Sequence, residues 1–256
     1  MGGKILFKGN DLVKFNEKQM RETRWKGISI VFQGAMNALN PVYKVGDQIV
    51  EAISIHESKV KKEEAKKRVE KLLETVGMEP SRADNYPHEF SGGMRQRALI
   101  AMALACNPDL LIADEPGTAL DVIVQAQVLR LMRELKKRLN LAMIMISHDL
   151  SIISETCDKI AIMYAGKIVE QGDISTIYKE PLHPYTQGLI GAFPSITAAK
   201  RRMTSIPGLP PDLLNPPPAC RFHPRCPYVM DICKKEEPKL VKAGKRYVAC
   251  HLVKKA

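Results

Sequence analysis

The chain has 256 residues, 45% of them apolar and 26% charged, a composition typical of a globular protein. No apolar run approaches the ~18 residues that a membrane-spanning helix needs. The start, Met1-Gly2-Gly3-Lys4, lacks the apolar core of a signal peptide, so we expect a cytosolic chain. The 39 Lys and Arg residues against 28 Asp and Glu residues give a net charge of +11, which suits a membrane surface, nucleic acid or anionic ligands and selects none of them.

The first part of the chain contains two strand signals and one helix signal. Residues 4–7 and the apolar run at residues 28–32 indicate short strands. Between Val60 and Val76 apolar residues recur at helical spacing, and Gly77 follows as a stop signal. This pattern predicts a helix that ends at Gly77.

Helices and strands then alternate along the chain. We expect helices at residues 91–105 and 122–139 and strands at residues 110–113, 142–146, 158–163 and 167–170. Alternation of this kind predicts an α/β domain with a mostly parallel sheet. Ligands of such sheets bind outside the carboxyl ends of the strands. Since Asp114, Glu115 and His148 each follow a strand, we expect them at one edge of the sheet.

The composition changes after about Tyr178. Half of the twelve residues at 207–218 are proline, so that segment should be stiff and extended. We therefore divide the chain into an α/β domain at residues 1–178 and a C-terminal extension at residues 179–256.

Asp114 and Glu115 give the first chemical signal. A hydrophobic strand that ends in two adjacent carboxylates is typical of phosphoryl-transfer sites, which hold Mg²⁺ and orient water. Asp114 would act on the metal, and Glu115 would accept a proton from the attacking water. The alternative is a strand that simply runs into a polar loop.

A glycine-rich helix start gives the second signal. In Ser91-Gly92-Gly93-Met94-Arg95-Gln96 the two glycines allow a close approach to anions, and the helix N-terminus favours phosphate. A plain glycine-rich turn is the alternative. His148 is placed to contact a terminal phosphate, although a histidine taken singly is more often a structural one.

Together these segments resemble one family, the ATP-binding cassette (ABC) ATPases. The matching segments are Ser91 to Gln96, Asp114-Glu115-Pro116, Ala119-Leu120-Asp121 and Ser147-His148-Asp149, with Val31-Phe32-Gln33 similar to the family's Q-loop. The resemblance covers roughly residues 2–187 and implies a P-loop NTPase-like core with a parallel sheet and a helical subdomain. It implies ATP and Mg²⁺ as ligands, with catalytic roles for Glu115, His148 and Gln33 and a magnesium site at Asp114 and Gln33. It implies nucleotide contacts by Ser91, Gly92, Gly93, Gln96, Asp114 and Asp121, where Asp121 links the two ATP sites of a dimer.

Two further segments narrow the resemblance. Asn37-Ala38-Leu39-Asn40-Pro41 and Pro181-Leu182-His183-Pro184-Tyr185-Thr186-Gln187 resemble the importers of dipeptides, oligopeptides and nickel. The implied protein is the ATP-hydrolysing subunit at the cytoplasmic face of the membrane. Its implied partners are a second ABC ATPase subunit, two permease subunits and, indirectly, an extracytoplasmic peptide-binding protein, with no nucleic acid. Two alternatives stay open: a non-transport cassette ATPase that acts on nucleic acid or ribosomes, and a metal-binding module with a vestigial cassette.

This sequence departs from the family at two places. No stretch reads G-x-x-x-x-G-K-[ST], the loop that cradles the ATP phosphates. Residues 1–7 instead resemble the strand that follows that loop, so we expect that the chain begins inside the cassette, that it is impaired as an ATPase on its own, and that exposed strand edges make it less stable. Gly117 stands where the subfamily favours Thr, which should loosen the turn after the catalytic strand.

Four cysteines crowd the C-terminal extension. Cys220, Cys226, Cys233 and Cys250 are separated by five, six and sixteen residues, and four thiolates suit a zinc ion or an iron–sulfur cluster. The similar tail of peptide-importer ATPases implies a [4Fe-4S] cluster, with Zn²⁺ as the alternative and His223 and His251 as possible substitute ligands. A small extension would need such a staple.

Overall fold

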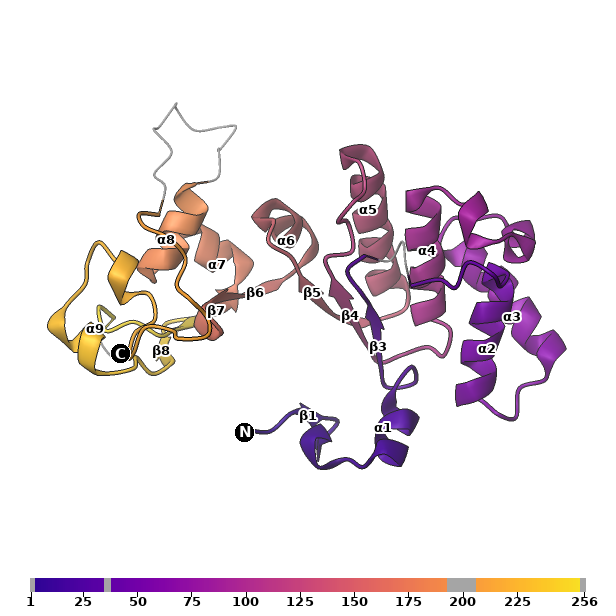
Figure 1. Ribbon diagram of the computed structural model, residues 1–256, viewed down its shortest axis with the longest axis horizontal. Helices are drawn as coiled ribbons and strands as arrows, with labels where there is room; N and C mark the ends of the chain where they lie inside the picture. The colour runs from indigo at the N-terminus through magenta and orange to yellow at the C-terminus, as the bar shows by residue number, and fades with distance from the viewer. Residues whose placement is uncertain (1–2, 35–37, 193–205, 254–256) are drawn as a thin grey trace. The chain divides into compact units, whose positions relative to one another are not determined.

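The computed structural model describes residues 3–34, 38–192 and 206–253, so Asn37 of the importer-like segment lies outside the described residues. The chain forms two compact units, Met1–Asp149 and Leu150–Ala256. Figure 1 shows the elements of each unit. No helix in the described part of the chain has the length and apolarity to cross a membrane.

The N-terminal unit is an α/β structure. Its strands are β1 (Leu6–Phe7), β2 (Asn10–Asp11), β3 (Ile28–Val31), β4 (Leu110–Asp114) and β5 (Ala142–Ile146). Its helices are α1 (Glu17–Thr23), α2 (Val45–His56), α3 (Lys62–Thr75), α4 (Gly92–Ala103) and α5 (Val122–Arg138), with 3₁₀ turns at Leu12–Lys14, Pro80–Asp84 and Pro87–Glu89.

Strands β3, β4 and β5 form a parallel sheet in that order, as predicted. Val31, Leu111 and Ala113 are buried on one face of this sheet. On the opposite face Ile30, Ile144 and Ile146 are 37%, 50% and 50% exposed, although their apolar runs indicate burial on both faces. Among the described residues only one face of the parallel sheet is therefore fully packed.

The core of this unit lies between that buried face and the helices. Helices α2, α3 and α4 contact one another, and α4 also contacts α5 and β3. The helix predicted at residues 60–76 is α3. It ends just before Gly77, whose backbone is left-handed with φ of +72°. Helix α2 was not predicted: its N-cap Lys44 makes no side-chain capping bond, so the sequence carries no start signal there.

The C-terminal unit combines an antiparallel sheet with short helices. Its strands are β6 (Lys159–Tyr164), β7 (Lys167–Asp173), β8 (Val241–Ala243) and β9 (Arg246–Val248). Its helices are α6 (Leu150–Thr156), α7 (Ile174–Lys179), α8 (Pro184–Gly191) and α9 (Asp231–Lys235), with a 3₁₀ turn at His223–Arg225.

The sheet of this unit has the order β6-β7-β9-β8, and all its pairs are antiparallel. The strands predicted at residues 158–163 and 167–170 therefore exist, but they pair with each other, and β7 pairs with β9 near the end of the chain and not with the parallel sheet. Only long-range pairing, such as that of Gln171 with Tyr247, reveals this arrangement.

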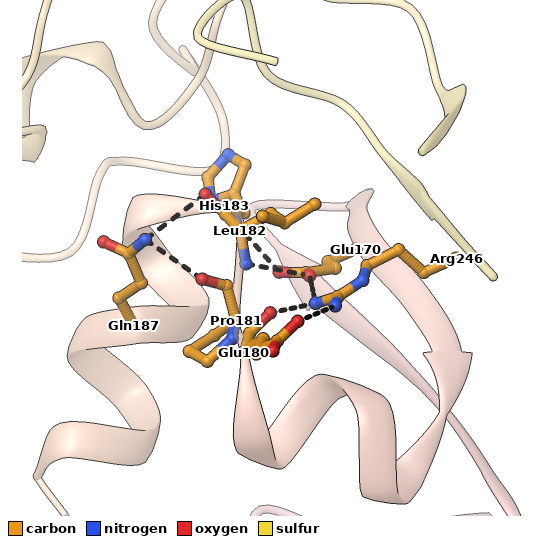
Figure 2. A network of polar contacts seen from close by, with 7 residues as sticks. All are labelled: Glu170, Glu180, Pro181, Leu182, His183, Gln187 and Arg246. Atoms are coloured by element: carbon orange, nitrogen blue, oxygen red, sulfur yellow. Dashed lines mark hydrogen bonds and ion pairs between the residues drawn. The ribbon is translucent and has the colours of Figure 1, made fainter. Parts of the chain in front are cut away.

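A buried polar network fixes the importer-like segment at residues 181–187 to this sheet (Figure 2). Glu170 of β7 is fully buried and accepts the backbone N–H groups of Leu182 at 3.0 Å and His183 at 2.9 Å. Arg246 of β9 lies 3.4 Å from the same carboxylate and also donates to the carbonyl of Glu180. Buried charges persist in proteins when they are paired in this way.

Candidate functional site

The parallel sheet brings three predicted site residues to one edge. Gln33 follows β3, Glu115 comes directly after β4, and His148 lies just after β5. Because the three strands are parallel neighbours in the order β3-β4-β5, their carboxyl ends meet at the same side of the sheet. Glu115 lies at the centre because its strand is the middle one.

The carboxylate of Glu115 accepts hydrogen bonds from three side chains. Gln33 Nε2 donates to Oε2 at 2.9 Å, and Thr118 Oγ1 donates to the same oxygen at 2.7 Å. His148 Nδ1 lies 2.8 Å from Oε1. The backbone N–H of Glu115 donates to the carbonyl of Ile146 at 2.9 Å, which ties the residue to the end of β5.

These contacts shift the acid–base chemistry of the pair. The hydrogen bond from Thr118, and then that from His148, lower the pKa of Glu115 below its ordinary value of 4.5. The hydrogen bond to Glu115 raises the pKa of His148 above 6.5. Glu115 is thus an ionised carboxylate at neutral pH, as a general base must be.

The backbone at Glu115 adopts a left-handed conformation with φ of 46°. A residue with a Cβ is disfavoured there by about 1–2 kcal/mol, and strain of this kind gathers at functional sites. The turn that follows is closed by the N–H of Thr118, which donates to the Glu115 carbonyl at 3.1 Å. The sequence patterns did not identify Thr118 as a partner of Glu115, and its position three residues later in a turn is the signal that could have revealed it.

Asp114 is the last residue of β4, opposite Ile146 in the sheet register. Its carboxylate and the amide oxygen of Gln33 are hard oxygen donors, the type that Mg²⁺ prefers. Mg²⁺ sites at phosphates need only one or two carboxylates, because water and the substrate supply the other ligands. The donor set at this edge therefore fits Mg²⁺ bound with a nucleotide.

The glycine-rich segment begins helix α4. Ser91 is the N-cap, and its Oγ accepts the N–H of Met94 at 3.3 Å. A Cβ at Gly93 would lie 2.5 Å from Cγ1 of Val124, so this glycine allows α4 to meet the start of α5. Gln96 is buried, and its amide nitrogen has no hydrogen-bond partner among the described residues.

Asp121 caps the start of α5, where its Oδ1 accepts the N–H of Val124 at 2.9 Å. Ser91 and Asp121 thus stand at the N-termini of two helices that pack together through Gly93. Neither of them is among the three side chains that donate to the Glu115 carboxylate. The structure places two groups of predicted residues: Gln33, Glu115 and His148 at the sheet edge, and Ser91 to Gln96 with Asp121 at the helix starts.

Gly117 does not leave an empty turn. A Cβ at this position would lie 2.6 Å from Cγ of Gln125, so the side chain of Gln125 occupies the space that a larger residue would need. The sequence-based expectation that Gly117 loosens the turn did not include this packing of Gln125 against the glycine.

The prediction of a metal centre in the C-terminal extension is wrong. Cys220, Cys226, Cys233 and Cys250 are free thiols, and no group of three or more His, Cys, Asp or Glu side chains in the described ranges is placed to hold a metal ion. This finding contradicts the [4Fe-4S] cluster, its Zn²⁺ alternative and a metal-stapled domain. Burial raises the pKa of the Cys220 and Cys226 thiols, and that of Cys250 to about 11, which favours the neutral thiol over the metal-binding thiolate.

The two candidate substitute ligands are engaged with the backbone. His223 Nδ1 lies 2.9 Å from the carbonyl of Cys220, and His251 Nε2 lies 3.0 Å from the carbonyl of Glu236. Packing holds the extension instead. Phe222 is buried, with its ring centroid 5.1 Å from that of Tyr164 and 5.5 Å from that of Tyr185.

Comparison with protein families gives two matches. A family described as "ABC transporter" matches residues 1–118. A family described as "Oligopeptide/dipeptide transporter, C-terminal region" matches residues 169–233, which include Glu170, His183 and Phe222.

Individual relatives agree with these matches. The chain is 51% identical over 245 residues to the oligopeptide transport ATP-binding protein OppD of Bacillus subtilis (strain 168). The aligned region covers 94% of this chain and 68% of that protein. It is 46% identical over 254 residues to the dipeptide transport ATP-binding protein DppD of Escherichia coli (strain K12), covering 98% of this chain and 77% of that protein. Among solved structures, cbiO1 from Clostridium perfringens, part of the ABC transporter complex cbiONQ, is 30% identical with a TM-score of 0.60, over 70% of this chain and 69% of that chain.

Proposed function

Because the chain belongs to the ATP-binding subunits of oligopeptide and dipeptide ABC transporters, we propose that it hydrolyses ATP at the Gln33–Glu115–His148 edge of its parallel sheet to drive peptide import. The family identifies the chain as an ABC ATPase of peptide transport. The observation that carries the assignment of the site is the Glu115 carboxylate, which accepts bonds from the ends of the two flanking strands.

The geometry suits a general-base mechanism. Glu115 stays ionised and would accept the proton of the attacking water, while Mg²⁺ at Asp114 and Gln33 would neutralise phosphate charge. His148 Nδ1–H donates to Glu115, so Nε2 can donate to a terminal phosphate only when the ring is protonated, a state that the raised pKa of His148 favours. The bonds from Gln33, Thr118 and His148 orient the base, and Oε1, which among the described residues takes only the bond from His148, can still accept one from the attacking water.

The residues at the starts of α4 and α5, here called the helix-start group, would act on a second subunit. Ser91, Gly92, Gly93 and Gln96 would complete the ATP site of a partner ATPase, and Asp121 would link the two sites. The remaining proposed partners are two permease subunits and, indirectly, an extracytoplasmic peptide-binding protein, with this chain at the cytoplasmic face of the membrane. The proposed division keeps residues 1–178 as the ATPase domain and residues 179–256 as the importer-type extension.

Neither alternative has comparable support. The only feature that favours a nucleic-acid or ribosome-associated ATPase is the net charge of +11. The alternative of a metal-binding module has no support among the described residues, because the four cysteines are free thiols.

The test is ATP hydrolysis by the chain assembled with its permease and ATPase partners. We expect Glu115→Gln to lower the turnover at this subunit of the assembly by about 100-fold or more, the contribution of a general base. Glu134→Gln, an exposed change on α5, is the matched control and should leave turnover unchanged. Equal turnover for Glu115→Gln and the original chain would refute the assigned base.

Mg·ATP binding to the purified chain tests a second point. Since the sequence contains no G-x-x-x-x-G-K-[ST] loop, we expect no saturation at millimolar Mg·ATP. Saturable tight binding would show that other residues hold the phosphates. If the assembled subunit does not hydrolyse ATP at all, Ser91→Ala should still slow hydrolysis at the partner, and a partner indifferent to Ser91→Ala would contradict the helix-start role.

A further inference from the structure

The C-terminal unit contains a cavity outside the proposed ATP site. Its volume is about 730 Å³, within the ~300–1,000 Å³ range of small-molecule sites. The walls are mainly apolar and aromatic and include Tyr164, Val169, Phe222 and Leu240. All its lining residues belong to the unit Leu150–Ala256, so the cavity is defined within one unit.

A buried polar side chain, that of His183, is part of the lining of this cavity. It is 1% exposed, and its ring projects away from the carboxylate of Glu170 in Figure 2. Its backbone N–H is held by Glu170 at 2.9 Å, and its Nδ1 accepts the N–H of Tyr185 at 3.0 Å. The position of the imidazole is therefore fixed by its neighbours.

The bond to Tyr185 also fixes the tautomer of His183. Burial lowers the pKa of His183 to about 4, so the ring is neutral at physiological pH. A neutral imidazole whose Nδ1 accepts a hydrogen bond carries its proton on Nε2. No described residue accepts from Nε2–H, which leaves a donor without a protein partner beside the cavity. Because His183 lines the cavity, a ligand there can supply the acceptor for this donor.

The charged side chains at the cavity indicate what that acceptor is. Lys167, Lys239 and Arg221 line it together with a single acid, Glu237. Lys167 pairs with Glu237 at 2.6 Å, and Arg221 donates to the carbonyl of Ala165. Lys239 is exposed at the rim of the lining, here called the mouth, and forms no ion pair with a described residue, so its charge is not neutralised there.

We propose that this cavity binds a small carboxylate with an apolar body, whose carboxylate accepts a hydrogen bond from His183 Nε2–H and lies near Lys239. The apolar body packs against Phe222, Tyr164 and Leu240, where burial of apolar surface supplies most of the affinity. Two sources share this chemistry: a medium-chain acyl acid and the C-terminus of a short apolar peptide. This site is separate from ATP hydrolysis and stands whether or not the chain turns over ATP.

Isothermal titration calorimetry of the full 256-residue chain tests the proposal with two probes, octanoate and the dipeptide leucyl-phenylalanine. We expect saturable one-site binding of at least one probe. Binding of octanoate alone assigns the acyl source, binding of the dipeptide alone assigns the peptide source, and binding of both supports recognition of the shared carboxylate. Saturable binding of neither probe at millimolar concentration would overturn the proposal.

Two variants locate the site. His183→Asn keeps a side-chain acceptor for the N–H of Tyr185 but removes the Nε2–H donor, and we expect roughly tenfold weaker binding from the loss of a hydrogen bond to a charged group. Lys239→Glu reverses the charge at the mouth without removing an internal contact, and should weaken binding about fivefold, as for an exposed ion pair. Lys245→Glu, an exposed lysine outside the cavity lining, is the matched control and should change little.

A thermal unfolding scan of each variant separates loss of binding from loss of fold. Lys239→Glu changes an exposed residue, so its result stands even if His183→Asn unfolds. If Lys239→Glu and Lys245→Glu bind equally well, the carboxylate does not lie at the assigned mouth, and the proposal fails.

Discussion

The Glu115 carboxylate gathers side chains that are distant in the sequence. Gln33, Thr118 and His148 reach it from the end of β3, the turn after β4 and the end of β5. The rule that ligand-binding side chains follow parallel strands predicted His148 near Glu115, and the resemblance to the family's Q-loop added Gln33. It could not predict Thr118, whose contact depends on the left-handed backbone of Glu115.

The first prediction concerns the pKa of His148. We expect this pKa to lie above 6.5, because Nδ1–H donates to the Glu115 carboxylate, and to fall to the ordinary value in Glu115→Gln. Titration of the histidine ring protons by NMR measures both values. His56, whose pKa burial lowers, is the internal control and should not respond. A His148 pKa that is unchanged by Glu115→Gln would contradict the pairing.

The same shifts set the pH range in which the pair stabilises the fold. The lowered pKa of Glu115 gives a contribution that is present above 4.5 and is lost as the pH falls through the folded-state pKa. The raised pKa of His148 gives a contribution that is fully present below 6.5 and is lost as the pH rises through its folded-state pKa. The pair therefore stabilises most between about pH 4.5 and 6.5, and the effect is small because both groups are near solvent.

At the scale of elements, a close approach joins α4 to α5. Gly93 leaves room for Cγ1 of Val124, and a β-branched side chain has little freedom to move aside. The same glycine belongs to the phosphate-binding motif that the sequence indicates. The structure gives it a packing role in addition, because any Cβ there would overlap Val124.

We predict that Gly93→Ala lowers the free energy of unfolding by about 1–3 kcal/mol through this overlap. In a Val124→Ala background the same substitution should be neutral or stabilising by up to about 1 kcal/mol, since Ala is the better helix former. Urea unfolding of the four proteins of this double-mutant cycle measures the coupling. Equal effects of Gly93→Ala in both backgrounds would argue against the contact.

A second element-scale prediction concerns the network that holds residues 180–187. Glu170→Ala removes the acceptor of two backbone N–H groups and leaves Arg246 buried beside an empty site, so we expect a loss of about 3–5 kcal/mol. Glu180→Ala, which removes the 79% exposed partner of the same arginine, should cost at most about 1 kcal/mol. Chemical denaturation of both variants decides the comparison. Similar losses would show that the buried carboxylate has no special role.

At the scale of the whole molecule, the two units have separate cores. The main hydrophobic cluster of buried residues runs from Val31 to Leu141 and lies entirely within the N-terminal unit. The C-terminal unit has its own buried apolar residues, with Ile177 fully inaccessible. Separate cores allow each unit to unfold as its own cooperative block.

We therefore predict two transitions in calorimetric unfolding. Leu111→Ala and Ile177→Ala each truncate a fully buried side chain and should each cost about 2–5 kcal/mol. Leu111→Ala should lower the midpoint of one transition only, and Ile177→Ala that of the other. A single transition shifted equally by both variants would show that the units unfold together.

The family, the parallel sheet around β4 and the residues at its carboxyl edge could be predicted from the sequence, because strand ends, glycines and carboxylates are local signals. Features that depend on partners far apart in the sequence became visible only in the folded chain. It placed β6 and β7 in an antiparallel sheet with β9, through pairings such as Gln171 with Tyr247. It left the clustered cysteines as free thiols, although their number and spacing indicated a metal site. It also buried Glu170 and His183, whose partners come from other elements, and burial depends on the whole fold.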